Sequence, residues 1–162
     1  MRLTDYTDYS LRVMLYLALK RDGLVTIQEI SDAYGISKNH LMKVVQQLGE
    51  QGWVDTIRGR NGGLRLAERS LELSVGAVVR ATENDFALVG CFPDEQGVRR
   101  ACVIEPQCRL KHALEAARAA FLAELDRHTI GEIAQPAAPL AGLLGLVPVK
   151  VVRPPAAAAR AR

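Results

Sequence analysis

The 162-residue sequence is poor in aromatic residues and has no long apolar run. Aromatic residues make up only 5% of the chain, which argues against a base-stacking surface for single-stranded nucleic acid. The longest apolar stretch, Leu140 to Val149, covers 10 residues, too few to span a bilayer. Arg2, Asp5 and Asp8 interrupt the first residues, so we expect no secretory signal. These absences predict a cytoplasmic protein that does not enter a membrane.

Signs of catalysis are also missing. The chain has neither a glycine-rich phosphate-binding loop nor a Gly-x-Ser-x-Gly motif. Its three histidines, His40, His112 and His128, fall in predicted helices with no paired nucleophile. We therefore do not expect an enzyme.

The net charge of +3 is small, but it is unevenly distributed. Residues 1–66 carry 9 Lys and Arg against 7 Asp and Glu, whereas residues 67–134 carry 8 against 11. A basic amino-terminal segment followed by an acidic one is typical of a protein that binds a polyanion through one of its faces. Residues 135–162 contain 5 prolines, many alanines and no acid, which predicts a disordered basic tail. Its four cations would add non-specific attraction to DNA: Lys150, Arg153, Arg160 and Arg162.

The first 50 residues predict three helices. Apolar residues that recur every three or four positions predict a helix over residues 7–20. Thr26 and Glu29 form a capping box that opens a second helix, which ends at Gly35. Ser37 then caps a third helix. Two short helices joined by a glycine-containing turn are typical of a helix-turn-helix, although the spacing alone favours an ordinary three-helix core.

The segment after the third helix shifts this balance towards DNA binding. Residues 53–57 and 64–66 are predicted strands, and Asn61-Gly62 predicts the hairpin turn because both residues tolerate positive φ. A basic hairpin directly after a helix-turn-helix is the layout of a winged helix. Five cations lie on the outer helix face and the hairpin, where DNA phosphates would lie: Lys38, Lys43, Arg58, Arg60 and Arg65.

These observations predict an interface with double-stranded DNA. Its lysines and arginines are expected at phosphates or groove edges, while Asn39 and His40 are expected to read bases. The expected DNA-binding residues are Ser37, Lys38, Asn39, His40, Lys43, Arg58, Arg60 and Asn61.

The rest of the chain predicts a mainly α protein with a long carboxy-terminal helix. Ser74 opens a fourth helix, residues 84–108 are irregular, and a long helix runs over about 109–128. A short helix with a capping box follows at Thr129. The long helix carries one apolar stripe, which a symmetric dimer or the chain's own first helix would cover. We therefore divide the chain into a winged helix-turn-helix (1–83), a cysteine loop (84–108), a dimerisation helix region (109–134) and the tail (135–162).

Cysteines are few, and all lie in the irregular loop. An odd number of cysteines in a cytoplasmic protein does not indicate a disulfide framework. The spacing of Cys91, Cys102 and Cys108 lacks the CxxC pairs of zinc ribbons and the tight spacing of ferredoxins. Metal ligation, redox chemistry and incidental packing all remain open. An iron–sulfur cluster would need a fourth donor, either a carboxylate from a second subunit or one of His112, Glu105, Asp94 and Glu95.

Four blocks of the sequence, taken in order, resemble the Rrf-type winged-helix regulators. They are residues 1–12 (MRLTDYTDYSLR), 37–45 (SKNHLMKVV), 58–65 (RGRNGGLR) and 102–114 (CVIEPQCRLKHAL). The last block looks like the NsrR branch of that family, the nitric-oxide-sensitive repressors. The resemblance covers about residues 1–134. It implies a homodimer on an inverted-repeat operator, with one iron–sulfur cluster, [4Fe-4S] or [2Fe-2S], in each subunit.

The resemblance also implies a set of cluster ligands. Asp8 of the partner subunit would be the fourth ligand, with Arg12 as its salt-bridge partner. A related branch, the cluster-assembly regulators, uses a histidine three residues after the last cysteine. This chain has Lys111 there and His112 one residue later, so we favour Asp8 over His112. The three cysteine ligands would be Cys91, Cys102 and Cys108.

Three other functions remain possible on the sequence. The same fold could sense iron, cluster status or an oxidant instead of nitric oxide. A cluster-free thiol switch could form a disulfide between Cys102 and Cys108. The cysteines could also bind a structural zinc ion in a simple binding module.

Overall fold

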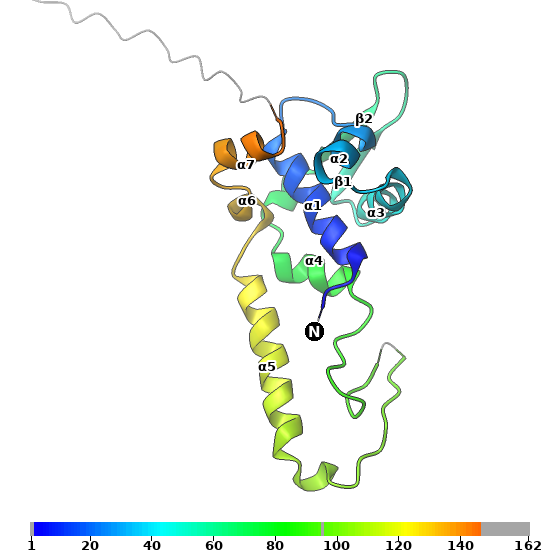
Figure 1. The fold of residues 1–162 in the computed structure, drawn as a ribbon, viewed down its shortest axis with the longest axis vertical. Coiled ribbons are helices and arrows are strands. Elements are labelled where there is room, and N and C mark those ends of the chain that lie inside the picture. Colours follow the sequence, from blue (N-terminus) through cyan, green and yellow to red (C-terminus); the bar gives the residue numbers. More distant parts are fainter. Residues whose placement is uncertain (1, 95, 147–162) are drawn as a thin grey trace, which may run out of the picture.

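A helical body and one projecting helix make up the chain in a computed structural model, which describes residues 2–94 and 96–146 (Figure 1). The mainly α expectation is confirmed, with a two-stranded antiparallel sheet as the wing. Glu95 and the four tail cations lie outside the described residues. The elements are α1 (Asp5–Leu19), α2 (Ile27–Tyr34), α3 (Lys38–Glu50), β1 (Val54–Ile57), β2 (Gly63–Leu66), η1 (Glu68–Leu71), α4 (Val75–Thr82), η2 (Glu105–Gln107), α5 (Arg109–Asp126), α6 (Ile130–Ile133) and α7 (Ala137–Leu143).

The first helix begins two residues earlier than expected, because Thr4 caps it. The Thr4 side chain accepts a hydrogen bond from the backbone N–H of Thr7, at 3.3 Å. The backbone N–H of Thr4 in turn donates to Glu83, just after α4, at 2.7 Å. The buried hydroxyls of Thr7 and Thr82 are hydrogen-bonded at 2.9 Å. The start of α1 is therefore joined to the end of α4.

The helix-turn-helix has the capping that its sequence predicts. Thr26 and Glu29 form both hydrogen bonds of the capping box, and α2 ends at Gly35 in the left-handed conformation. The Ser37 side chain accepts from the backbone N–H of His40 and caps α3. The inner face of α3 is buried as expected, through Leu41, Val44, Val45 and Leu48.

The wing forms in the expected place, but its turn differs from the prediction. β1 pairs with β2 in an antiparallel register that places Asp55 opposite Arg65. The prediction of a turn at Asn61-Gly62 was wrong, because neither residue has a positive φ. The turn in this five-residue connection runs from Gly59 to Gly62, with Arg60 and Asn61 at its centre, and the positive φ, 118°, occurs at Gly59, where a residue without a side chain is favoured. The N–H of Gly62 closes the turn by donating to the Gly59 carbonyl at 3.0 Å.

The hydrophobic core extends beyond the expected boundary at residue 83. Ile130 of α6 is fully buried with the core residues of α1 to α4, and its N–H donates to the Leu73 carbonyl at 2.9 Å. The short helix with the capping box therefore returns to the amino-terminal body. The most deeply buried side chains are Val13, Met14, Leu17, Val25, Ile30, Leu41, Leu48, Val78, Val79 and Ile130.

The helix α5 forms an arm, whereas part of the expected disordered tail is folded. None of the α5 residues is buried, and Figure 1 shows its first turns far from the body. The expectation of disorder from residue 135 was wrong for α7, which packs on α1. Pro139 lies in the first turn of α7, where a missing N–H breaks no helical hydrogen bond. Leu144 and Leu146 then pack against the core. Among the described helices, none is long and apolar enough to cross a membrane.

Candidate functional site

The outer face of α3 and the wing loop present unpaired positive charge. Lys38, Lys43, Arg58 and Arg60 are exposed, and none has an ion-pair partner among residues 2–94 and 96–146. Arg65 differs, because its Nε lies 2.9 Å from an oxygen of Asp55 on the opposite strand. The wing projects from the body beside α3 (Figure 1). The expected phosphate-contacting cations therefore share one end of the body, and Arg65 is already neutralised.

The polar residues expected at DNA differ in how they are held. Asn39 and Asn61 are exposed, and Ser37 is used as the helix cap. His40 stacks on Tyr9 of α1, with ring centroids 6.0 Å apart and planes inclined by 25°. Its ring therefore lies on the flank of α3 that faces α1. The sequence reasoning missed Tyr9, whose only signal was its position in the first resembling block.

Asp8 lies on α1 in an ion pair that the sequence predicted. The Nε of Arg12 donates to Asp8 at 2.9 Å, and this hydrogen bond raises the pKa of Arg12. The Arg12 guanidinium also lies over the Tyr34 ring, 5.6 Å from its centroid. Burial raises the pKa of Tyr34, whose buried hydroxyl has no hydrogen-bond partner within the described part of the chain. The Asp8–Arg12 pair on α1 thus lies near the end of α2, at the turn of the helix-turn-helix.

The three cysteines are free thiols on the segment between α4 and α5. Cys91 is half-buried beside Phe92, which is only 2% exposed and lies under the guanidinium of Arg118 in α5. Cys102 is exposed. Cys108 caps α5, and its sulfur accepts a hydrogen bond from the N–H of Lys111 at 3.4 Å. Phe92 and Arg118, which the sequence reasoning did not select, therefore anchor the cysteine segment to α5.

Two of the four expected alternative donors are occupied. Lys111 Nζ lies 2.8 Å from Glu105, Arg99 also pairs with this carboxylate, and the Lys111 hydrogen bond lowers the pKa of Glu105. Asp94 accepts hydrogen bonds from the backbone N–H groups of residues 96 and 98. His112 is exposed one helical turn after Cys108. Glu95, the remaining candidate, lies outside the described residues.

A single chain does not bring the expected metal ligands together. Asp8 lies on α1 in the body, whereas Cys108 lies at the start of α5, at the far end of the arm (Figure 1). Within the part of the chain that the structure describes, no group of three His, Cys, Asp or Glu side chains could hold a metal ion. The described part of one chain therefore does not place Asp8 beside the cysteines.

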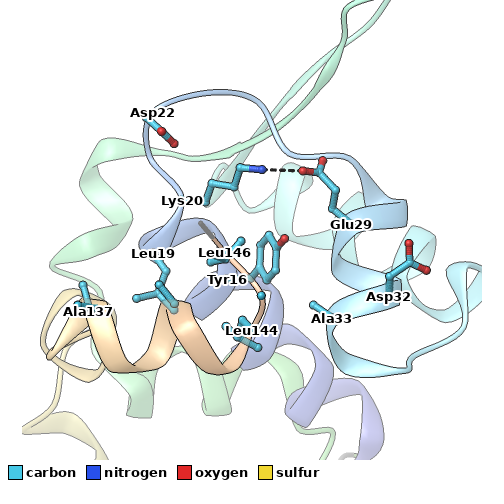
Figure 2. Close-up of a pocket in the computed structure, with 13 residues that line it drawn as sticks. Tyr16, Leu19, Lys20, Asp22, Glu29, Asp32, Ala33, Ala137, Leu144 and Leu146 are labelled. Atoms are coloured by element: carbon cyan, nitrogen blue, oxygen red, sulfur yellow. Dashed lines mark hydrogen bonds and ion pairs between the residues drawn. The ribbon is translucent and has the colours of Figure 1, made fainter. Parts of the chain in front are cut away.

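A separate cavity of about 710 Å³ lies between α1, α2 and α7. Figure 2 shows the Lys20–Glu29 ion pair at this cavity, with an Nζ–Oε1 distance of 2.6 Å. Burial raises the pKa of Glu29, but hydrogen bonds from Lys20 and Thr26 outweigh burial and leave it lowered. The cavity contains none of the residues expected at DNA or metal, and α7 provides one of its walls.

Known proteins with similar sequences and folds are regulators of transcription. The family model Rrf2, described as an iron-dependent transcriptional regulator, matches residues 3–136. The HTH-type transcriptional regulator NsrR of Bacillus licheniformis is 52% identical over 134 residues, which cover 82% of this chain and 92% of that protein. The NsrR of Bacillus subtilis is 51% identical over 134 residues, with coverages of 82% and 90%. The crystal structure of oxidised Staphylococcus aureus CymR shares the fold, with a TM-score of 0.64, 23% identity and coverages of 83% and 97%.

Proposed function

This chain belongs to the Rrf2 family of transcriptional regulators, and we propose that a nitric-oxide-sensitive iron–sulfur cluster controls its repression. It is a DNA-binding repressor and not an enzyme, as the sequence predicted. The observation that carries the proposal is the identity of about half of the aligned residues with two NsrR proteins. We infer that the protein acts in the cytoplasm as a homodimer.

The cysteines of this chain suit an iron–sulfur cluster. Thiolates are the ligands that such clusters use, and three free thiols lie on one irregular segment. The N–H of Lys111 already donates to the Cys108 sulfur, a type of contact that also tunes cluster-bound sulfur. In the proposal Cys91, Cys102 and Cys108 hold the cluster of their own subunit, and Asp8 reaches it from the other subunit.

The uncovered surface of α5 supports the dimer. Leu122 and Leu125, near the end of the helix, pack against the core, but Leu110 near its start is 65% exposed. An apolar stripe of this length on an arm is stabilised when a second copy covers it, and a two-fold axis pairs identical surfaces. Each subunit then supplies its Asp8 to the cluster of the other subunit and receives the other's Asp8 at its own cluster.

Contacts between α1 and α3 explain how this arrangement would reach DNA. When bound, the cluster supplies iron atoms with which nitric oxide reacts. Asp8 fixes α1 relative to the partner subunit, and α1 packs on α3, partly through the Tyr9–His40 stack. The two recognition helices must match half-sites about 34 Å apart along the duplex. Release of Asp8 would free α1, disturb this spacing and lower the affinity for an inverted repeat.

Anaerobic purification followed by iron and sulfide analysis tests the proposal. We expect iron and sulfide in the protein, and release of the bound duplex at near-stoichiometric nitric oxide, measured by fluorescence anisotropy. A loss of coupling of about 3 kcal/mol would weaken binding more than a hundredfold. A metal-free protein that still represses would favour a thiol switch, and bound zinc would favour a structural module. Release by iron depletion or peroxide but not by nitric oxide would indicate a different signal.

The role of Asp8 can be separated from that of its neighbours on α1. Asp8→Ala should lower iron retention and change the visible absorption spectrum of the cluster, because one ligand is replaced. Asp5→Ala is the matched control, since Asp5 lies on the same helix in an exposed pair with Arg2. His112→Ala should leave the spectrum unchanged. A spectrum that changes with His112→Ala but not with Asp8→Ala would contradict the assignment.

A further inference from the structure

Met42 is a large apolar side chain that the fold leaves in solvent on α3. It is 51% exposed, although the neighbouring Leu41 is completely buried. Ile57 of β1 is the other exposed large hydrophobic residue described in the helix-turn-helix and wing. The remaining ones lie on the cysteine segment, α5 or α7, outside the helix-turn-helix and wing. The described part of this chain leaves about half of Met42 uncovered.

The surroundings of Met42 are those of a surface that meets DNA. Asn39 and Gln46 are its neighbours on the helix face, three residues before and four residues after it. Lys38 and Lys43, one turn before and one residue after, have no ion pair within the described residues. Gln46 is engaged by Glu50, to which its amide donates at 3.0 Å. An apolar group therefore lies between polar ones on a positively charged face.

We propose that Met42 is a specificity-determining residue that packs against the 5-methyl group of a thymine in the major groove. This inference rests on the proposed DNA-binding function and adds to it a residue and the chemical group that it reads. The thymine methyl is the apolar group that base pairs present in the major groove. The unpaired lysines favour a polyanion over a second protein as the occupant of this face. The methionine side chain, with three rotatable bonds and a polarisable sulfur, adapts to such a contact.

Deoxyuridine provides a probe that removes only the methyl group. The anaerobically purified dimer is first used to enrich a duplex from a random pool, and each thymine of that duplex is then replaced singly. We expect one position in each half-site where the replacement weakens wild-type binding about fourfold, the effect of one buried methyl group. Met42→Ala removes the contact in both subunits, so it should weaken binding to the thymine duplex about sixteenfold and abolish the sensitivity at these positions. Met42→Leu should restore both.

Controls distinguish this inference from the function on which it rests. Leu143→Ala removes another exposed apolar side chain, 86% exposed on α7, and should behave as wild type. Equal sensitivity of wild type and Met42→Ala to deoxyuridine at every position would overturn the inference while leaving DNA recognition intact. A change in dimer mass with Met42→Ala would also overturn it, because the side chain would then lie in a protein interface. Failure to enrich any duplex would overturn the DNA-binding function itself.

Discussion

Ion pairing separates the cations of the wing into two kinds. Arg65 is held by Asp55 across the hairpin, whereas Arg58 and Arg60 on the loop have no such partner within the described residues. The carboxylate beside Arg65 offsets the attraction that its guanidinium would exert on a phosphate. We therefore expect the loop arginines to contribute most of the electrostatic attraction that this hairpin exerts on DNA.

Arg60→Ala should weaken binding to every duplex and reduce its salt dependence. Each lost phosphate contact lowers the slope of log affinity against log salt by about 0.9 for every subunit bound. The measurement is anisotropy over a series of salt concentrations. Arg127→Ala is the control, since Arg127 is an exposed cation that pairs with Glu124 on α5, outside the proposed interface. An unchanged slope for Arg60→Ala would remove Arg60 from the interface.

The Glu29 carboxylate contributes to stability in a pH-dependent way. Its pKa is raised by burial, but the bonds from Lys20 and Thr26 lower it overall. Glu29→Gln keeps an oxygen for the capping box and loses the charge, so it should reduce the free energy of unfolding by about 0.5–1 kcal/mol at pH 7. Because the pKa of Glu29 is lower in the folded state, its charge stabilises the folded protein at pH values above the unfolded-state pKa of about 4.3. This stabilisation is lost as the pH falls through the folded-state pKa.

Urea unfolding at pH 7 and at pH 3 measures this difference. Glu72→Gln serves as the control, because no ion pair of Glu72 is present in the described part of the chain. A stability deficit of Glu29→Gln that persists at pH 3 would show that the carboxylate charge is not its cause.

At the level of elements, the junction of α4 and α5 sets where the arm leaves the body. Asp126, at the end of α5, accepts from the Ser74 hydroxyl at 3.2 Å and pairs with Arg80, and this pairing lowers the pKa of Asp126. Gly76 allows this approach. A Cβ at that position would lie 2.1 Å from an Asp126 carboxylate oxygen and 3.0 Å from its backbone nitrogen.

Gly76→Ala should therefore loosen the junction. Crowding of this kind lowers the free energy of unfolding by about 1–3 kcal/mol. Gly142→Ala in α7 is the matched control, since a Cβ there meets no atom within 4 Å. It should leave stability unchanged or raise it by up to about 1 kcal/mol, as alanine favours helix over glycine. The measurement is the urea concentration at the midpoint of unfolding for both variants. Equal midpoints would mean that α4 and α5 separate easily.

At the scale of the whole molecule, the apolar stripe of α5 is a hydrophobic surface that residues 2–94 and 96–146 leave partly uncovered. The arm α5 has no buried residue, and the proposed iron site needs ligands from two subunits. In the proposed function, both features depend on the same dimer. Loss of the α5 interface should therefore affect the oligomeric state, cluster retention and operator affinity together.

Leu114→Asp tests this dependence, because Leu114 belongs to the apolar stripe of α5, one helical turn after Leu110. Two leucine side chains, each worth about 1.5–3 kcal/mol when buried, are lost in a two-fold interface, so association should weaken more than about a hundredfold. Sedimentation equilibrium should give the mass of a single chain. Leu143→Asp changes an exposed leucine of α7 and should leave the dimer intact. A dimer that survives Leu114→Asp would place the subunit interface elsewhere.

Local interactions could be read from the chain, whereas contacts between distant segments could not. Thr26, Ser37 and Ser74 cap helices where the sequence predicts, because a cap depends on residues only two or three positions away. The Asp8–Arg12 pair, which the family resemblance implied, is also local, because the two residues lie one helical turn apart. The wing turn and α7 were misjudged, because loop length and packing against α1 outweighed local composition. The Tyr9–His40 stack, the Phe92 anchor and the exposure of Met42 depend on how separate helices pack, and tertiary structure alone settles that.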